Sequence, residues 1–195
     1  MTDDPFQWNE TIGELLKYAL VRRSREQQAL SIHRLVQTVL RDALDQPIYR
    51  QWTEQTIRAV ERVFPSGIDP ANWVKCKLLL PHAQVCAILI ERHDLSSEEA
   101  ANLLHRMASY LYQHARYSEA EPLFLRTLWI WERNLGPDHP QVASPLNNLA
   151  NLYREQGKHS EAEPLYLRAL RIWERNLGHD HSLTRQVRNN YAIFL

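Results

Sequence analysis

The chain repeats part of itself at an interval of 42 residues. The segment 117–136 (YSEAEPLFLRTLWIWERNLG) returns as 159–178 (HSEAEPLYLRALRIWERNLG), with sixteen of twenty positions identical. Self-similarity at intervals of about 20–50 residues is typical of arrays in which each unit buries its apolar face against its neighbours. The sequence therefore predicts a stack of similar structural units in this part of the chain.

Each unit reads as two helices joined by a turn. Apolar residues at spacings of three and four give the second helix one apolar face, made of Ala162, Leu165, Tyr166, Ala169, Leu170, Trp173 and Leu177. Gly178 follows directly, as Gly136 does one unit earlier, and glycine commonly ends a helix. We expect helix pairs over 97–114 with 118–135 and over 140–156 with 160–177, then a half unit over 182–195.

The spacing of small and aromatic residues resembles that of tetratricopeptide repeats. The matching positions are Ala143, Leu146, Leu149, Ala150, Tyr153, Gly157, Ala162, Tyr166, Ala169 and Leu170. The 42-residue period, LNNLANLY and LGPDHP look like the long variant found in kinesin light chains and many bacterial proteins. The resemblance implies an all-α fold, a right-handed superhelix of helical hairpins, with two full repeats and one half repeat over 96–195. It also implies a protein or peptide ligand in the concave groove.

Residues 1–95 do not repeat. The segment WNETIGELLKYALVRRSREQQALSIHRLVQTVLRDAL reads as helix, β-hairpin, helix, and resembles the winged-helix module of STAND-class signalling ATPases, the NB-ARC and NACHT relatives. We expect a partial winged-helix-like region over 1–46 and a helical bridge over 47–95 that caps the repeats. The resemblance implies that the chain is the C-terminal sensor or regulatory part of a bacterial-style ATPase. It places His33 at an MHD-like motif, where it would sense nucleotide in a longer protein.

The first helices should line the groove with residues that point away from the core. The expected peptide-binding residues are Asn147, Asn148, Asn151 and Arg154 in the second unit, His105, Ser109 and Tyr112 in the first, and Asn189 and Asn190 in the last helix. An asparagine amide both donates and accepts, so a ladder of them can bind an extended backbone without demanding its sequence. The resemblance supports this role, since the matching asparagines of kinesin-light-chain-like repeats contact bound peptide.

Composition argues against several other functions. Lys plus Arg equals Asp plus Glu at 23 each, so the chain lacks the basic excess typical of nucleic-acid binding. We find no nucleophile motif and no Walker-type loop, and we read His179-Asp180-His181 as a capping turn, so we expect no enzyme, cofactor or metal. The apolar run 83–90 is too short to span a bilayer. Cys76 and Cys86 read as reduced core thiols, so we expect a cytoplasmic protein without membrane contact.

Two other functions are compatible with the sequence. The last helix carries Tyr191, Ala192, Phe194 and Leu195 on a stripe with no following helix to cover it, which would allow a homodimer. Alternatively, a winged-helix regulator could contact DNA through the basic residues Arg22, Arg23 and Arg25, although Glu26 follows at once and no basic helix supports them. Both stay open beside the binding scaffold.

Overall fold

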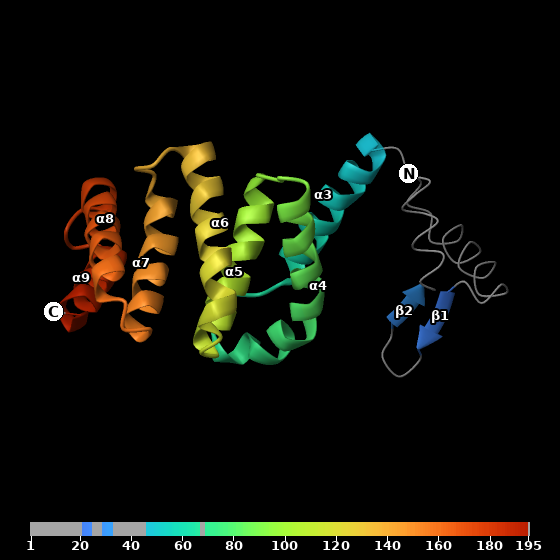
Figure 1. Cartoon of the computed structure of the whole chain (residues 1–195), viewed down its shortest axis with the longest axis horizontal. Coiled ribbons are helices and arrows are strands. Elements are labelled where there is room, and N and C mark those ends of the chain that lie inside the picture. The colour runs from blue at the N-terminus through green and yellow to red at the C-terminus, as the bar shows by residue number, and fades with distance from the viewer. Residues whose placement is uncertain (1–20, 25–28, 33–45, 67–68, 195) are drawn as a thin grey trace. The chain divides into compact units, whose positions relative to one another are not determined.

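The structure, a computed structural model, describes residues 21–24, 29–32, 46–66 and 69–194. The chain divides into two compact units, 1–52 and 53–195. In the first unit, strands β1 (Val21–Ser24) and β2 (Ala29–Ile32) pair antiparallel, with Val21 opposite Ile32 (Figure 1). His33 and most of the region compared with a winged helix lie outside the described residues, so that comparison stays a prediction.

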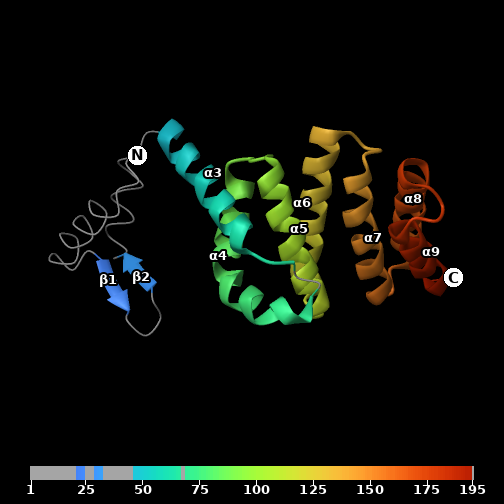
Figure 2. The same cartoon turned by 180° about the vertical axis from the view of Figure 1, so that it is seen from behind.

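The described part of the second unit is helical throughout. Its elements are α3 (Gln46–Val63), which begins in the first unit, the short 3₁₀ turn η1 (Pro70–Asn72), α4 (Trp73–Arg92), α5 (Glu98–Gln113), α6 (Tyr117–Leu135), α7 (Pro140–Glu155), α8 (His159–Leu177) and α9 (Ser182–Phe194). Helices α4 to α9 follow one another in a row in both views, and each contacts the next (Figures 1 and 2). The predicted helical solenoid is confirmed, while its handedness stays a prediction.

The sequence period is also the period of the structure. Helices α5 and α6 begin and end 42 residues before α7 and α8, so every position in the first hairpin has a counterpart in the second. The small residues Ala120 and Ala162 are fully buried, as are the aromatic residues Phe124 and Tyr166, four positions further along. A small side chain at a crossing lets two helices approach closely, and the neighbouring ring fills the space beside it.

Glycines end the two long second helices, as the sequence predicts. Gly136 and Gly178 have φ angles of 92° and 88°, a region in which a side chain would be strained. Their N–H groups donate to the carbonyl oxygens of Glu132 and Glu174, which closes the last turn of α6 and of α8. The chain then reverses into the next first helix.

Helix α4 has one buried side and one exposed apolar side. Cys76 and Cys86 are free and buried, as predicted, and burial raises the pKa of the Cys86 thiol to about 11. The opposite side carries four exposed apolar residues, Val74, Leu78, Val85 and Ile88. Among the described residues, one span, Pro70–Arg92, is long and apolar enough to cross a membrane by length and composition. The expected absence of membrane contact therefore stays a prediction.

Candidate binding surface

One face of α7 is left open between its neighbours. Helix α7 packs against α6 and α8 and also contacts α5 and α9, so most of its surface is covered. The residues that remain partly or fully exposed along one line are spaced by three and four positions: Gln141, Ser144, Asn148, Asn151 and Glu155. This spacing places them on one helical stripe, which we call the α7 face. It is polar along its whole length.

The α7 face contains two of the predicted asparagines, and the predicted Arg154 lies beside it. Asn148 is partly exposed, and the Asn151 Oδ1 accepts a hydrogen bond from the Tyr166 hydroxyl at 2.6 Å. Arg154 donates to the carboxylate of Glu155 at 2.6 Å, and its side chain is 23% exposed. Burial raises the pKa of Tyr166 to about 12, so its hydroxyl stays a donor that orients the Asn151 amide. The Asn148 amide and the Arg154 guanidinium are thus accessible to a ligand.

Asn147 was expected on this surface, and that expectation is wrong. Its side chain is only 4% exposed, and its Oδ1 accepts a hydrogen bond from Asn190 Nδ2 at 3.0 Å. Helix α9 covers this side of α7, so the residue joins two helices and is closed to a ligand. Asn190 is therefore engaged as its partner and is only partly exposed, whereas Asn189 is exposed. Ligand contact by Asn189 stays a prediction.

The three residues predicted in the first repeat are mostly turned inward. His105 packs its ring against Phe124 and Trp131 of α6, at centroid distances of 5.9 and 5.3 Å, so it does not line an open groove as expected. Burial lowers the pKa of His105 to about 4, with a further contribution from the charge of Arg106. A neutral imidazole is what this apolar contact requires.

Ser109 also differs from the expectation, because it is 4% exposed and donates to the His105 carbonyl oxygen at 2.9 Å in its own helix. Tyr112 is partly buried, and its ring lies 5.7 Å from that of Tyr117. Burial raises the pKa of Tyr112, and the charge of Glu155 raises it further. Ligand contact by Tyr112 stays a prediction.

Helix α3 approaches the corresponding face of α5. Arg106 Nη1 donates to the carbonyl oxygens of Glu61 and Phe64, both at 3.0 Å, and its Nη2 lies 2.7 Å from the Glu61 carboxylate. A second ion pair joins Arg58 to Glu99 at 3.0 Å. A basic side chain on the last carbonyls of a helix is favourable, since the helix dipole is negative there.

These contacts lie at positions equivalent to the α7 face. Arg106 corresponds to Asn148 and Glu99 to Gln141, each 42 residues apart. Our reading of the sequence missed Arg106 and Glu99 on α5 and Gln141, Ser144 and Glu155 on the α7 face. The period could have identified Arg106, which lies 42 positions before the predicted Asn148.

Polar contacts between repeats fix the neighbouring helices in register. The hydroxyl of Tyr153 donates to Glu121 at 3.1 Å, and the hydroxyl of Tyr191 donates to Glu163 at 3.1 Å. Burial, together with the Glu121 carboxylate, raises the pKa of Tyr153 to about 12. Tyr191, expected on an uncovered stripe of the last helix, therefore contacts the preceding hairpin through its hydroxyl.

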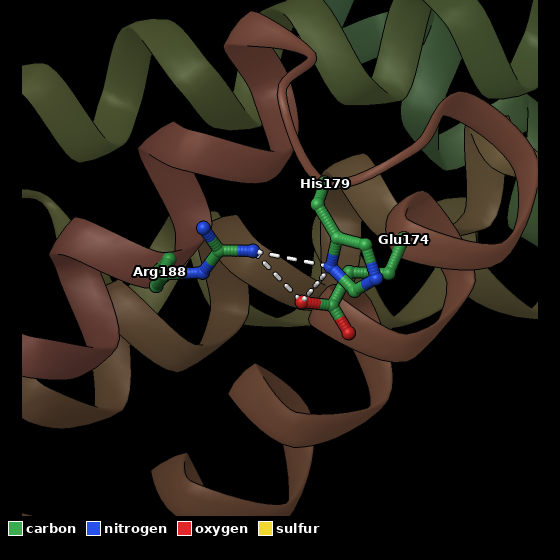
Figure 3. Close-up of polar contacts among 3 residues, drawn as sticks. All are labelled: Glu174, His179 and Arg188. Carbon is green, nitrogen blue, oxygen red and sulfur yellow. Dashed lines mark hydrogen bonds and ion pairs between the residues drawn. The ribbon is translucent and has the colours of Figure 1, made fainter.

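An exposed polar cluster joins the end of α8 to α9. The Glu174 carboxylate accepts from Arg188 at 2.9 Å and lies 3.1 Å from His179 Nδ1 (Figure 3). The hydrogen bond from Arg188 holds the pKa of Glu174 below its usual range, and His179 contributes in the same direction. Among the described residues, no group of three or more His, Cys, Asp or Glu side chains is placed to hold a metal ion. The cluster links α8 and the turn that follows it to the last helix, α9.

Comparisons with known proteins identify the repeats. Residues 99–174 and 143–194 match the family model described as Tetratricopeptide repeat. Residues 99–194 form a tetratricopeptide-repeat domain. The predicted repeat family is thereby confirmed. Residues 1–48 match a second family model, described only as a domain of unknown function (DUF7779).

One relative and one solved structure resemble a larger part of the chain. A nucleotide-binding leucine-rich repeat (NLR)-like protein of Hyaloscypha variabilis is 32% identical over 136 residues, which cover 69% of this chain and 14% of the relative. The chain thus spans only a small part of that relative's length. The crystal structure of BtubC (BKLC) from P. vanneervenii aligns with a TM-score of 0.48 at 20% identity, over 73% of this chain and 65% of that one.

Proposed function

We propose that the tetratricopeptide-repeat domain is a non-catalytic scaffold that binds a protein or peptide on the α7 face. The observation that supports this most directly is the stripe itself, an uninterrupted polar face between two covering helices. Asn148 offers an amide donor and acceptor there, and Arg154 offers a positive charge beside it. Such groups bind the carbonyl and N–H groups of another chain, or its carboxylates.

The partner that fits best is a segment whose backbone runs along α7 and which carries an acidic group toward Arg154. A repeat domain of this family suits such a role, since stacked hairpins present one continuous surface to a ligand. We take Asn148, Asn151 and Arg154 as the central contacts, with Tyr112 and Asn189 at the two ends. The proposal assigns these residues a binding role and no catalytic role.

The experiment selects peptides that bind the chain and then compares their affinities for two variants that each lack one arginine. Peptides selected on the full chain from a random display library are measured by fluorescence anisotropy against Arg154→Ala and Arg171→Ala. Each variant removes one arginine, and Arg171 is exposed on α8, away from the α7 face. We expect Arg154→Ala to weaken the selected peptides about tenfold or more, because a charge-assisted hydrogen bond is lost. Equal binding to both variants, or loss with Arg171→Ala alone, refutes the assignment.

The wider role that we propose is sensing within a STAND-type signalling protein. The similarity to an NLR-like protein supports it. In this proposal the repeats are of the kinesin-light-chain-like type, the first unit is the winged-helix remnant, and the protein is cytoplasmic. Binding of a partner would be signalled through the first unit to a nucleotide switch, which requires that the partner favour one of two conformations.

Self-association through α9 is a second candidate. Ile193 is 75% exposed and Ala192 is exposed, so α9 carries apolar surface away from α8. Exposed apolar surface on a helix is suited to pairing with a second copy. Light scattering at high protein concentration tests this: a dimer abolished by Ile193→Glu supports it, and a monomer at all concentrations removes it.

A further inference from the structure

The face of α5 that corresponds to the α7 face is contacted by another part of the same chain, helix α3. Positions 99 and 106 of α5 are the counterparts of positions 141 and 148 on the α7 face, yet they are occupied by Arg58 and Glu61 of α3. The face that is open on the second repeat is thus partly covered on the first. The occupant reaches α5 from residues 53–64, which belong to the same compact unit as the repeats.

Helix α3 is attached by buried side chains and by charged contacts. Thr53 and Ile57 of α3 are buried at 4% and 1% exposure, Val60 packs partly buried against the core, and Phe64, directly after the helix, is 0% exposed. Ile48, Trp52 and Val63 are each more than 40% exposed. The Arg58–Glu99 pair is accessible to solvent, since its side chains are 54% and 35% exposed, whereas in the Arg106–Glu61 pair the side chains are 36% and 13% exposed. Ion pairs of this kind contribute little each and exchange readily with other charged partners.

Helix α3 also continues past the boundary between the units. It starts at Gln46, and the boundary falls between Trp52 and Thr53, inside the helix. The two residues of α3 that form ion pairs with α5, Arg58 and Glu61, both lie on the second-unit side of this boundary.

We propose that α3 is a displaceable latch, which a partner extending from the α7 face onto α5 releases by replacing its contacts with Glu99 and Arg106. This inference rests on the proposed function, which it deepens by defining the partner. Such a partner presents a basic group to Glu99 and an acidic group to Arg106, as Arg58 and Glu61 do from one helix face three positions apart. Release of α3 from α5 is then the response of the second unit to the partner.

The test uses the full chain and a labelled, end-blocked peptide with the sequence of residues 46–66. In the variant Arg58→Ala with Glu61→Ala, α3 is loosened while α5 keeps its wild-type residues. We expect the peptide to bind this variant about tenfold more tightly than the wild-type chain, which corresponds to the loss of two ion pairs. Adding Arg106→Gln to the variant should abolish the gain. Equal affinity for the wild type and the loosened variant overturns the proposal.

Hydrogen exchange provides a second measurement that does not depend on the peptide. In Arg106→Gln, amides of residues 53–63 should exchange about tenfold faster while those of α7 and α8 keep their wild-type rates, since only the latch opens. An unchanged rate in α3, or an equal acceleration in all helices, also overturns the proposal. A peptide selected for Arg154-dependent binding tests the α7 face separately. The latch can therefore fail while the proposed function stands.

Discussion

Replacing Asn147 and Asn148 in turn should separate a structural amide from a ligand-binding one. The two residues are adjacent and chemically identical, but Asn147 is 4% exposed and bonded to Asn190, whereas Asn148 is partly exposed on the α7 face. Asn147→Ala removes a buried hydrogen bond and the packing of the amide against α9. We expect a loss of unfolding free energy of about 1–2 kcal/mol. Asn148→Ala should change it by less than about 0.5 kcal/mol.

Thermal unfolding followed by circular dichroism at 222 nm measures the difference. For a domain of this size, about 1 kcal/mol lowers Tm by roughly 2–4 °C, so Asn147→Ala should melt several degrees below wild type. Asn148→Ala should melt with the wild type and yet weaken peptides selected on the α7 face. Two variants with the same Tm, or a less stable Asn148→Ala, would show that the assignment of the buried amide is wrong.

Three further predictions concern packing, acid stability and thiol reactivity. Ala162→Leu should cost about 1–3 kcal/mol in urea unfolding, because Ala162 is fully buried between helices; an unchanged midpoint would contradict this. The pKa of Glu174 is lowered by Arg188 and His179, so this stabilisation is complete above the usual carboxyl pKa and is lost as the pH falls through the lowered value. Glu174→Gln should therefore lose less stability than wild type between about pH 5 and pH 3, and parallel acid curves would exclude the effect. Burial raises the pKa of Cys86 to about 11, so iodoacetamide at pH 8 should alkylate it only after unfolding; rapid labelling of the folded chain would refute its burial.

The fold of the repeats could be read from local pattern. Each helix boundary between residues 97 and 182 lies within two positions of the prediction. Apolar spacing, the positive-φ glycines and the 42-residue period all act within one or two helices, so no knowledge of distant contacts was needed. The buried tryptophans show the same: Trp131 and Trp173 belong to an apolar stripe, and they are 5% and 3% exposed.

The binding surface was harder to predict. The helical pattern correctly places Asn148 and Asn151 away from the core, but it cannot show that Asn147 and Ser109 are covered as well. A first helix of a repeat packs on its partner and also on the helices of the repeats before and after it. The buried arc is therefore wider than the apolar stripe alone suggests, and polar residues at its edge pair with each other.

The sequence by itself determined the repeat unit, its helices and its apolar core, because these follow from residue spacing along a single chain. The tertiary structure alone decided which polar residues face outward and that α3 lies against α5 through Arg106. That contact joins residues more than 40 positions apart. It depends on how the chain returns after α3, and no local pattern around Arg106 differs from that of a solvated surface arginine.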